Sequence, residues 1–231
     1  MAFQGYTQQT VDFMWGIRFN NERGWFLEHK DDYINTFLTP TRELGEQVYD
    51  AVHALLPDEP LMLKVSRIYR DARRLFGRGP YKDHLWWCIR TGDKDWTGRP
   101  TFWFELGPDY YSFGLGFWSP AAALMETYRK QIDAHPEELS KLVRQFNRQS
   151  VFTLDGPEYA RSKGQTSDLL RPWYQKKSLS LRWEGPLDER IFTSALAEDI
   201  IDGFKTLIPF YHYFNKLVAL TPRQERRGED A

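Results

Sequence analysis

Basic side chains are concentrated between Lys64 and Lys82, where they could recognise a bound anion. This segment holds seven lysines and arginines and one acidic residue, Asp71, so it carries +6 while the rest of the chain carries −7. Arginine guanidinium groups match phosphate and carboxylate bidentately. The stretch RDARRLFGRGPYKD, residues 70–83, adds glycines whose backbone amides can help to cradle an anion.

The charge excess has three interpretations. Ion pairing with acidic helices elsewhere comes first, because a run of charge is usually a solvated face and surface pairs contribute only about 0–1 kcal/mol each. The second is a pocket for a small anion, and the third is contact with nucleic acid through basic residues set between aromatic rings. The letters GRGPYK do not match the phosphate-binding pattern G-x-x-x-x-G-K-[ST].

We predict from the second interpretation a cleft for a small anionic ligand bearing phosphate or carboxylate. Arg70, Arg73 and Lys82 would hold the anion, and Tyr81 and Tyr110 would form its walls. A non-enzymatic module that binds an acidic protein or RNA through the same arginines is the alternative.

Lys30 is the second candidate of interest, because it stands on an otherwise apolar stripe of a predicted helix with Phe26, Tyr33 and Phe37. A buried cation needs a partner or must extend to water. Asp71 is its natural protein partner, and the two would position the ligand or serve as acid and base. If they only pair with each other, the site is architectural.

Other catalytic chemistries find little support. Cys88, the only cysteine, lies in an apolar strand and is expected to be a small core residue. The five histidines show no metal-ligand spacing, although His84 lies two residues from Lys82. Glu105 is a weaker acid–base candidate that shares a strand face with Thr101 and Trp103. No cofactor and no metal site is predicted.

The elements that would position these residues are helices at both ends and strands in the middle. The hydrophobic pattern favours an α+β fold with a mainly antiparallel sheet of about five strands, packed against N- and C-terminal helices. Turn residues 107–109 join two β-rich runs as a hairpin. Residues 151–177 are expected to be irregular. Within them the basic stretch 161–177 is either an ordinary connecting loop, the first interpretation, or a lid that closes over the basic turn. The predicted helices are 8–19, 22–38, 41–56, 120–133, 136–149, 187–204 and 207–220, and the predicted strands are 61–69, 84–90, 101–106, 110–118 and 178–184.

Composition limits the class of protein. Of the 231 residues, 16% are aromatic, with nine tryptophans, so a large aromatic core is expected. The net charge of −1 argues against a general affinity for nucleic acid. The start of the chain lacks signal-peptide features and no apolar run is long enough for a membrane span. We expect a cytoplasmic protein with one domain over residues 1–220 and a disordered tail over 221–231.

Several blocks resemble a bacterial and fungal family known as domain of unknown function 2461. They are Asn20-Asn21, Trp25-Phe26, Lys30 and Tyr33, then RIYRDARRLFGRGPYK at 67–82, then the hairpin TFWFELGPDYYSFGLGFW, over roughly residues 3–218. The resemblance adds Arg129, in the helix after the hairpin, to the ligand-binding set. It implies no activity, cofactor or partner, and oligomeric state stays open.

Overall fold

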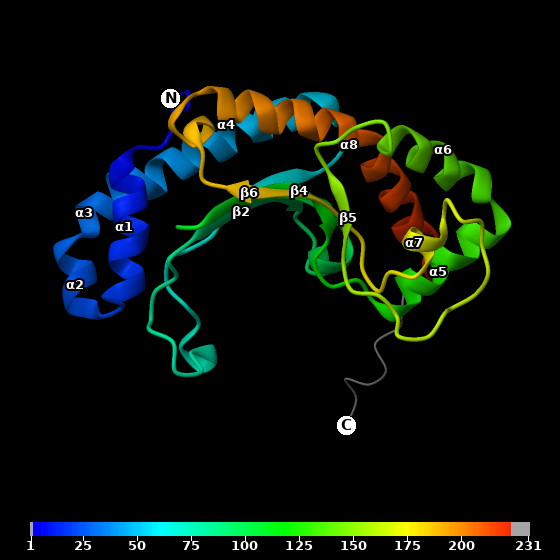
Figure 1. Cartoon of the computed structure of the whole chain (residues 1–231), viewed down its shortest axis with the longest axis horizontal. Helices are drawn as coiled ribbons and strands as arrows, with labels where there is room; N and C mark the ends of the chain where they lie inside the picture. The colour runs from blue at the N-terminus through cyan, green and yellow to red at the C-terminus, as the bar shows by residue number, and fades with distance from the viewer. Residues whose placement is uncertain (1, 223–231) are drawn as a thin grey trace.

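The computed structural model describes residues 2–222, which form an arched antiparallel sheet covered by helices on its outer face (Figure 1). Six strands follow the order β1-β2-β3-β4-β6-β5. The strands are β1 (Leu61–Val65), β2 (Leu85–Thr91), β3 (Pro100–Leu106), β4 (Tyr110–Phe117), β5 (Thr153–Asp155) and β6 (Ser180–Pro186). The α+β class and the antiparallel sheet are therefore as predicted, with one strand more than the five expected.

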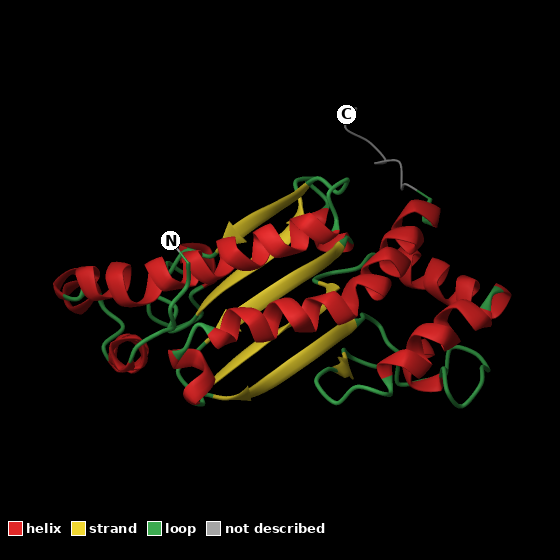
Figure 2. Cartoon of the chain, turned by 90° about the horizontal axis from the view of Figure 1, so that it is seen from above, coloured by secondary structure: helices red, strands yellow, loops and turns green. Residues whose placement is uncertain are grey.

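Two long helices, α4 and α8, lie across one face of the sheet (Figure 2). The remaining helices flank the sheet at its two ends (Figure 1). The α-helices are α1 (Gln8–Phe19), α2 (Arg23–Glu28), α3 (Lys30–Asp32), α4 (Thr39–Leu55), α5 (Ala122–Ala134), α6 (Pro136–Phe146), α7 (Arg171–Tyr174) and α8 (Ala195–Leu220). The π-helix η1 (Tyr33–Leu38) joins α3 to α4, and 3₁₀ turns are η2 (Ala72–Arg74), η3 (Trp96–Gly98) and η4 (Glu189–Phe192).

Side-chain alternation gives the sheet two unlike faces. On the covered face, Trp87 stacks on Phe104 with ring centroids 5.4 Å apart, and Phe102 meets Phe204 of α8 at 4.8 Å. These side chains are fully buried, and burial of such large rings is the main favourable contribution to folding. The opposite, concave face has no helix across it in Figure 1.

The hairpin prediction is confirmed, since β3 pairs with β4 and the amide of Gly107 donates to the carbonyl of Tyr110. Two other segments differ from expectation. The segment predicted as one helix over 22–38 is divided at His29 and ends in η1. Residues 151–177 contain the short edge strand β5 and α7.

The two helices predicted at the C-terminal end are one helix, α8, with Pro209 inside it. An internal proline removes a backbone hydrogen bond and costs about 3 kcal/mol. Buried side chains on both sides of it, including Leu207, Phe210 and Tyr211, offset that cost by packing on the sheet and its neighbours. Tertiary packing therefore overrides the local break signal.

Two further findings concern membrane spans and the C-terminal tail. Among residues 2–222 no helix combines the length and apolar character needed to cross a bilayer. The tail predicted beyond residue 220 lies, from residue 223 onward, outside the described residues.

Candidate functional site

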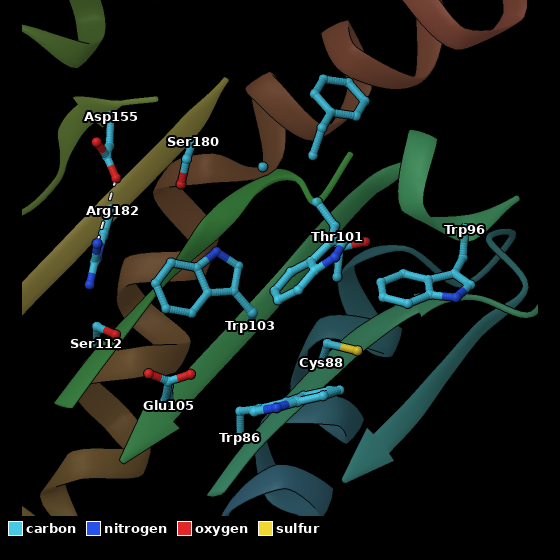
Figure 3. A pocket seen from close by; sticks show the side chains of 13 residues that line it. Trp86, Cys88, Trp96, Thr101, Trp103, Glu105, Ser112, Asp155, Ser180 and Arg182 are labelled. Atoms are coloured by element: carbon cyan, nitrogen blue, oxygen red, sulfur yellow. Dashed lines mark ion pairs between the residues drawn. The ribbon is translucent and has the colours of Figure 1, made fainter. Parts of the chain in front are cut away.

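A cavity of about 420 Å³ opens on the concave face of the sheet (Figure 3). Four indole rings line it, from Trp86, Trp96, Trp103 and Trp118. The polar side chains in its lining are Thr101, Glu105, Ser112, Asp155, Ser180 and Arg182. A concave, largely aromatic hollow with a few polar groups is the usual form of a small-molecule site.

Strand register assembles this lining from residues far apart in the sequence. Trp86 of β2 is paired with Glu105 of β3, which is paired with Ser112 of β4. The next row joins Trp103 to Gly114 and then to Arg182 of β6. Because directly paired residues share a face, each row places its side chains together on the concave side. The same strands send their alternate residues into the core.

The glycines of β4 make room for a neighbouring strand. A Cβ atom on Gly114 would collide with the carbonyl oxygen of Leu181 in β6, and one on Gly116 would lie 2.8 Å from the Cα of Ser180. The close neighbour of both glycines is therefore the backbone of β6. Gly116 also lines the cavity.

Glu105 anchors the polar end of the cleft. Its carboxylate accepts a hydrogen bond from the hydroxyl of Tyr110, and burial together with this acid raises the pKa of Tyr110 well above its usual range. Arg182 forms ion pairs with Glu184 and, at 3.6 Å, with Asp155, and its guanidinium lies 5.8 Å from the Trp103 ring centroid. Tyr110 is thus a neutral hydrogen-bond donor, and Arg182 is already neutralised.

Lys82 is the cation at the edge of the cleft that lacks such neutralisation. Its Nζ lies 5.6 Å from the centroid of the Trp86 ring, and among the described residues no carboxylate lies within 4.0 Å of it. Burial, and then the charge of Arg70, lower its pKa to about 8, against an opposing effect of Glu105. A half-buried ammonium held on an aromatic face is well suited to meet an incoming anion.

The two predicted arginines serve other contacts. Arg70 donates from Nε to the carbonyl of Tyr81 at 2.8 Å, and its Nη2 lies 3.9 Å from Asp83. Arg73 is bound to the carboxylate of Asp71 through both Nε and Nη2, and its side chain is 87% exposed at the tip of the loop. The connection between β1 and β2, residues 66–84, is the basic loop. Arg70 therefore holds the base of the basic loop in place, and Arg73 points to solvent.

An ion-pair network holds that loop against α1. Arg18 contacts Asp83 at 2.6 Å and Asp109 at 2.5 Å, and Asp83 also lies 3.0 Å from Nδ1 of His84. The contacts with His84 and Arg18 keep the pKa of Asp83 well below its usual range despite partial burial. This network places Lys82 beside the cleft.

The remaining predicted residues lie at three separate places. Tyr81 is buried and stacks on Phe26 at 4.3 Å, so it belongs to the core. Lys30 lines a different hollow beside β1. Arg129 lies 5.2 Å from the ring of Tyr159, a residue of the segment 151–177. Part of that segment was expected to close over the basic turn. Of the predicted set, Tyr110 bonds to Glu105, and Lys82 lies close enough for the charge of Glu105 to act on its pKa.

Sequence reasoning missed the indole lining and Arg182. The signals available were the high tryptophan content and the alternation of side chains along the sequences of β3 and β6. Cys88 is buried as expected, and burial raises its pKa to about 11, so the thiol stays protonated. Among residues 2–222 no group of three His, Cys, Asp or Glu side chains could hold a metal ion.

A family model described as "Conserved hypothetical protein (DUF2461)" matches residues 9–213. No curated protein matches the chain.

Proposed function

The chain belongs to the DUF2461 family, and we propose that it binds a small, ring-bearing anionic ligand on the concave face of its sheet. The observation that carries this proposal is Lys82, a half-buried cation without an ion pair among residues 2–222, held over Trp86 at the edge of the cavity. The anionic group would meet the ammonium of Lys82. The ring would pack among the indoles, since flat aromatic walls favour flat ligands.

Glu105 supports the choice of ligand. Its carboxylate takes one hydrogen bond from Tyr110 and has further lone pairs to accept another. A ligand with an N–H or O–H donor on its ring would satisfy it. The class we propose is therefore an aromatic carboxylate or phosphate with a ring donor, at a size suited to about 420 Å³.

We assign acid–base chemistry to the same cleft. A lysine with a pKa of about 8 changes charge close to neutral pH, as a general acid or base must. The roles first given to Asp71 and Lys30 are thus better supported for Lys82 and Glu105, because Asp71 is bound to Arg73 on the exposed loop.

A thermal-shift screen of aromatic carboxylates and nucleoside monophosphates tests the proposal. A ligand present at ten to a hundred times its Kd should stabilise the protein by about 1.4–2.7 kcal/mol. Lys82→Met should remove the shift for anions, and Trp103→Ala should remove it for ring-bearing compounds. Lys141→Met, an exposed lysine of α6, is the matched control. Shifts that survive both cleft variants would contradict the proposal.

The loop tip favours a second candidate, contact with RNA or an acidic protein. Phe76 is 82% exposed and has a positive φ of 48°, a strained backbone for a bulky side chain. It lies between Arg73 and Arg78, which are also exposed. The variant Arg73→Gln/Arg78→Gln should reduce both the affinity for a single-stranded oligonucleotide and its salt dependence. Unchanged binding would exclude the loop as a nucleic-acid contact.

A further inference from the structure

A second hollow, of about 290 Å³, lies beside the edge strand β1 and outside the cleft described above. Its lining comes from α2, α3, η1, α4, the last residue of β1 and the segment that follows β1. Three of its residues are cations, Lys30, Arg42 and Arg67, and three are aromatic, Phe26, Tyr33 and Tyr69. Nothing in the proposed function uses these six side chains.

All the charged side chains that line this hollow are positive. No acidic side chain lines it. Over residues 2–222, none of the three cations has a carboxylate within the 4.0 Å of an ion pair. The nearby acids in the sequence, Asp31, Asp32 and Glu43, lie outside the lining. Lys30, Arg42 and Arg67 are exposed side chains that line the same hollow, so all three would attract an anion bound there.

The walls of the hollow are aromatic. Phe26 and Tyr33 are buried with ring centroids 5.6 Å apart, and Tyr69, which is 56% exposed, meets the edge of Phe26 at 5.8 Å. Burial raises the pKa of Tyr33 to about 12 even though Arg42 acts in the opposite direction. Tyr33 therefore stays neutral and does not compensate the positive charge.

The local backbone shapes this hollow. Tyr33 and Leu38, both in its lining, are the two ends of η1, whose π-helical turns bond residue i to residue i+5. Such turns are rare and occur frequently at functional sites. The widened turn lies between the helix that carries Lys30 and the helix that carries Arg42.

We propose that this hollow binds the phosphate group of a small aromatic phosphate monoester. A phosphate monoester carries close to two negative charges at pH 7, which suits three cations better than a single carboxylate does. Arg42 and Arg67 would contact the phosphate oxygens through guanidinium forks, and Lys30 would add a point charge. The ring would lie along Tyr69 and Phe26.

A site-resolved titration tests this proposal. Amide signals of residues 66–69 are followed by ¹⁵N NMR while phenyl phosphate is added to the full chain at low ionic strength and pH 7.5. Arg42→Gln and Lys30→Gln should each weaken binding by about tenfold, as expected for one charge-assisted contact. Arg67 is left intact, because its charge also reaches Lys82. Arg144→Gln, an exposed arginine of α6, should have no effect.

Two further variants separate the parts of the site. Tyr69→Ala should weaken phenyl phosphate by about fivefold, the value of one aromatic contact, and leave inorganic phosphate unchanged. Lys82→Met removes a charge that acts on Arg67 but no lining residue of this hollow, so it should weaken the titration at residues 66–69 much less than Arg42→Gln does. Failure of the cleft proposal would therefore not affect this result. Absence of shifts at these amides, equal weakening by Arg144→Gln, or loss of binding in Lys82→Met alone would each overturn the proposal.

Discussion

The two faces of one sheet use the same strands for different purposes. The face under α4 and α8 is filled by apolar side chains such as Trp87, Phe102 and Phe104, all fully buried. The concave face carries tryptophans, Glu105 and Arg182 around an open cavity. A side-chain period of two lets each strand serve both faces. The covered face can therefore be optimised for packing while the concave face keeps polar groups that add little to stability.

The largest effect on stability is expected from a comparison of two adjacent residues of β3 that point to opposite faces. Phe104→Ala removes a fully buried ring stacked on Trp87 and should lower the free energy of unfolding by about 3–5 kcal/mol. Trp103→Ala removes a half-buried ring from the cavity wall and should cost only about 1–2 kcal/mol. Urea denaturation measures both values. Equal losses would mean that the concave face is part of the core.

A substitution at Gly114 tests how closely the backbones of β4 and β6 must approach each other. A Cβ atom there would collide with the carbonyl oxygen of Leu181, and that oxygen belongs to the backbone of a paired strand. Gly114→Ala should therefore cost about 1–3 kcal/mol, as overpacking does. Gly24→Ala, where no heavy atom lies within 4 Å, is the control and should be neutral or stabilising. A harmless Gly114→Ala would show that β4 and β6 can separate.

The faces also differ in how well the sequence predicts them. The covered face follows from alternation alone, so the β3–β4 hairpin and the antiparallel sheet could be predicted. The pairing of β4 with β6, which are more than sixty residues apart, could not, because nothing local encodes it. That pairing brings Arg182 beside Trp103. The strand β5 was missed because its three residues carry too short a pattern.

The basic loop shows that local sequence also predicts only part of the site. Local composition selected Lys82, and its Nζ lies 5.6 Å from the ring centroid of Trp86, which lines the cavity. Composition could not tell Lys82 from Arg73, since both belong to one charge excess. Long-range contacts separate them: Arg18 reaches Asp83, next to Lys82, while Arg73 pairs locally with Asp71. Lys30 was expected beside the same anion, and the turn at η1 assigns it to another hollow.

Lys82 gives a prediction about pH. Because its pKa is lowered to about 8, mainly by burial, affinity for an aromatic carboxylate that binds the ammonium should fall about tenfold between pH 7 and pH 9. Lys82→Met should bind more weakly and without this pH dependence. Calorimetric titration at the two pH values measures the change. A flat wild-type affinity up to pH 9 would assign the anion to another cation.

The stability of Lys82→Met provides the control. The wild-type free energy of unfolding should rise with pH, whereas a lysine in an ion pair would make it fall. Between pH 8 and the ordinary value of 10.5, the unfolded chain binds more protons than the folded one, so the free energy of unfolding rises with pH. Lys82→Met should lose this rise. Urea denaturation across the window would show whether Lys82 is desolvated, whatever the ligand.

The smallest effect on stability is expected at Ser112, where stability and binding should separate most clearly. Its side chain is 1% exposed on the concave face, and its hydroxyl has no hydrogen-bond partner among the described residues. A buried hydroxyl without a partner is unfavourable, so Ser112→Ala should change the free energy of unfolding by less than about 0.5 kcal/mol or raise it. If a ligand supplies the missing partner, the same variant should weaken binding by about two- to tenfold. Thermal-shift titration of wild type and variant with one aromatic carboxylate measures both quantities. A variant that loses stability without losing affinity would mean that Ser112 stabilises the sheet and does not contact the ligand. The contrast between a packing face and a binding face would then be wrong at the residue directly opposite Glu105.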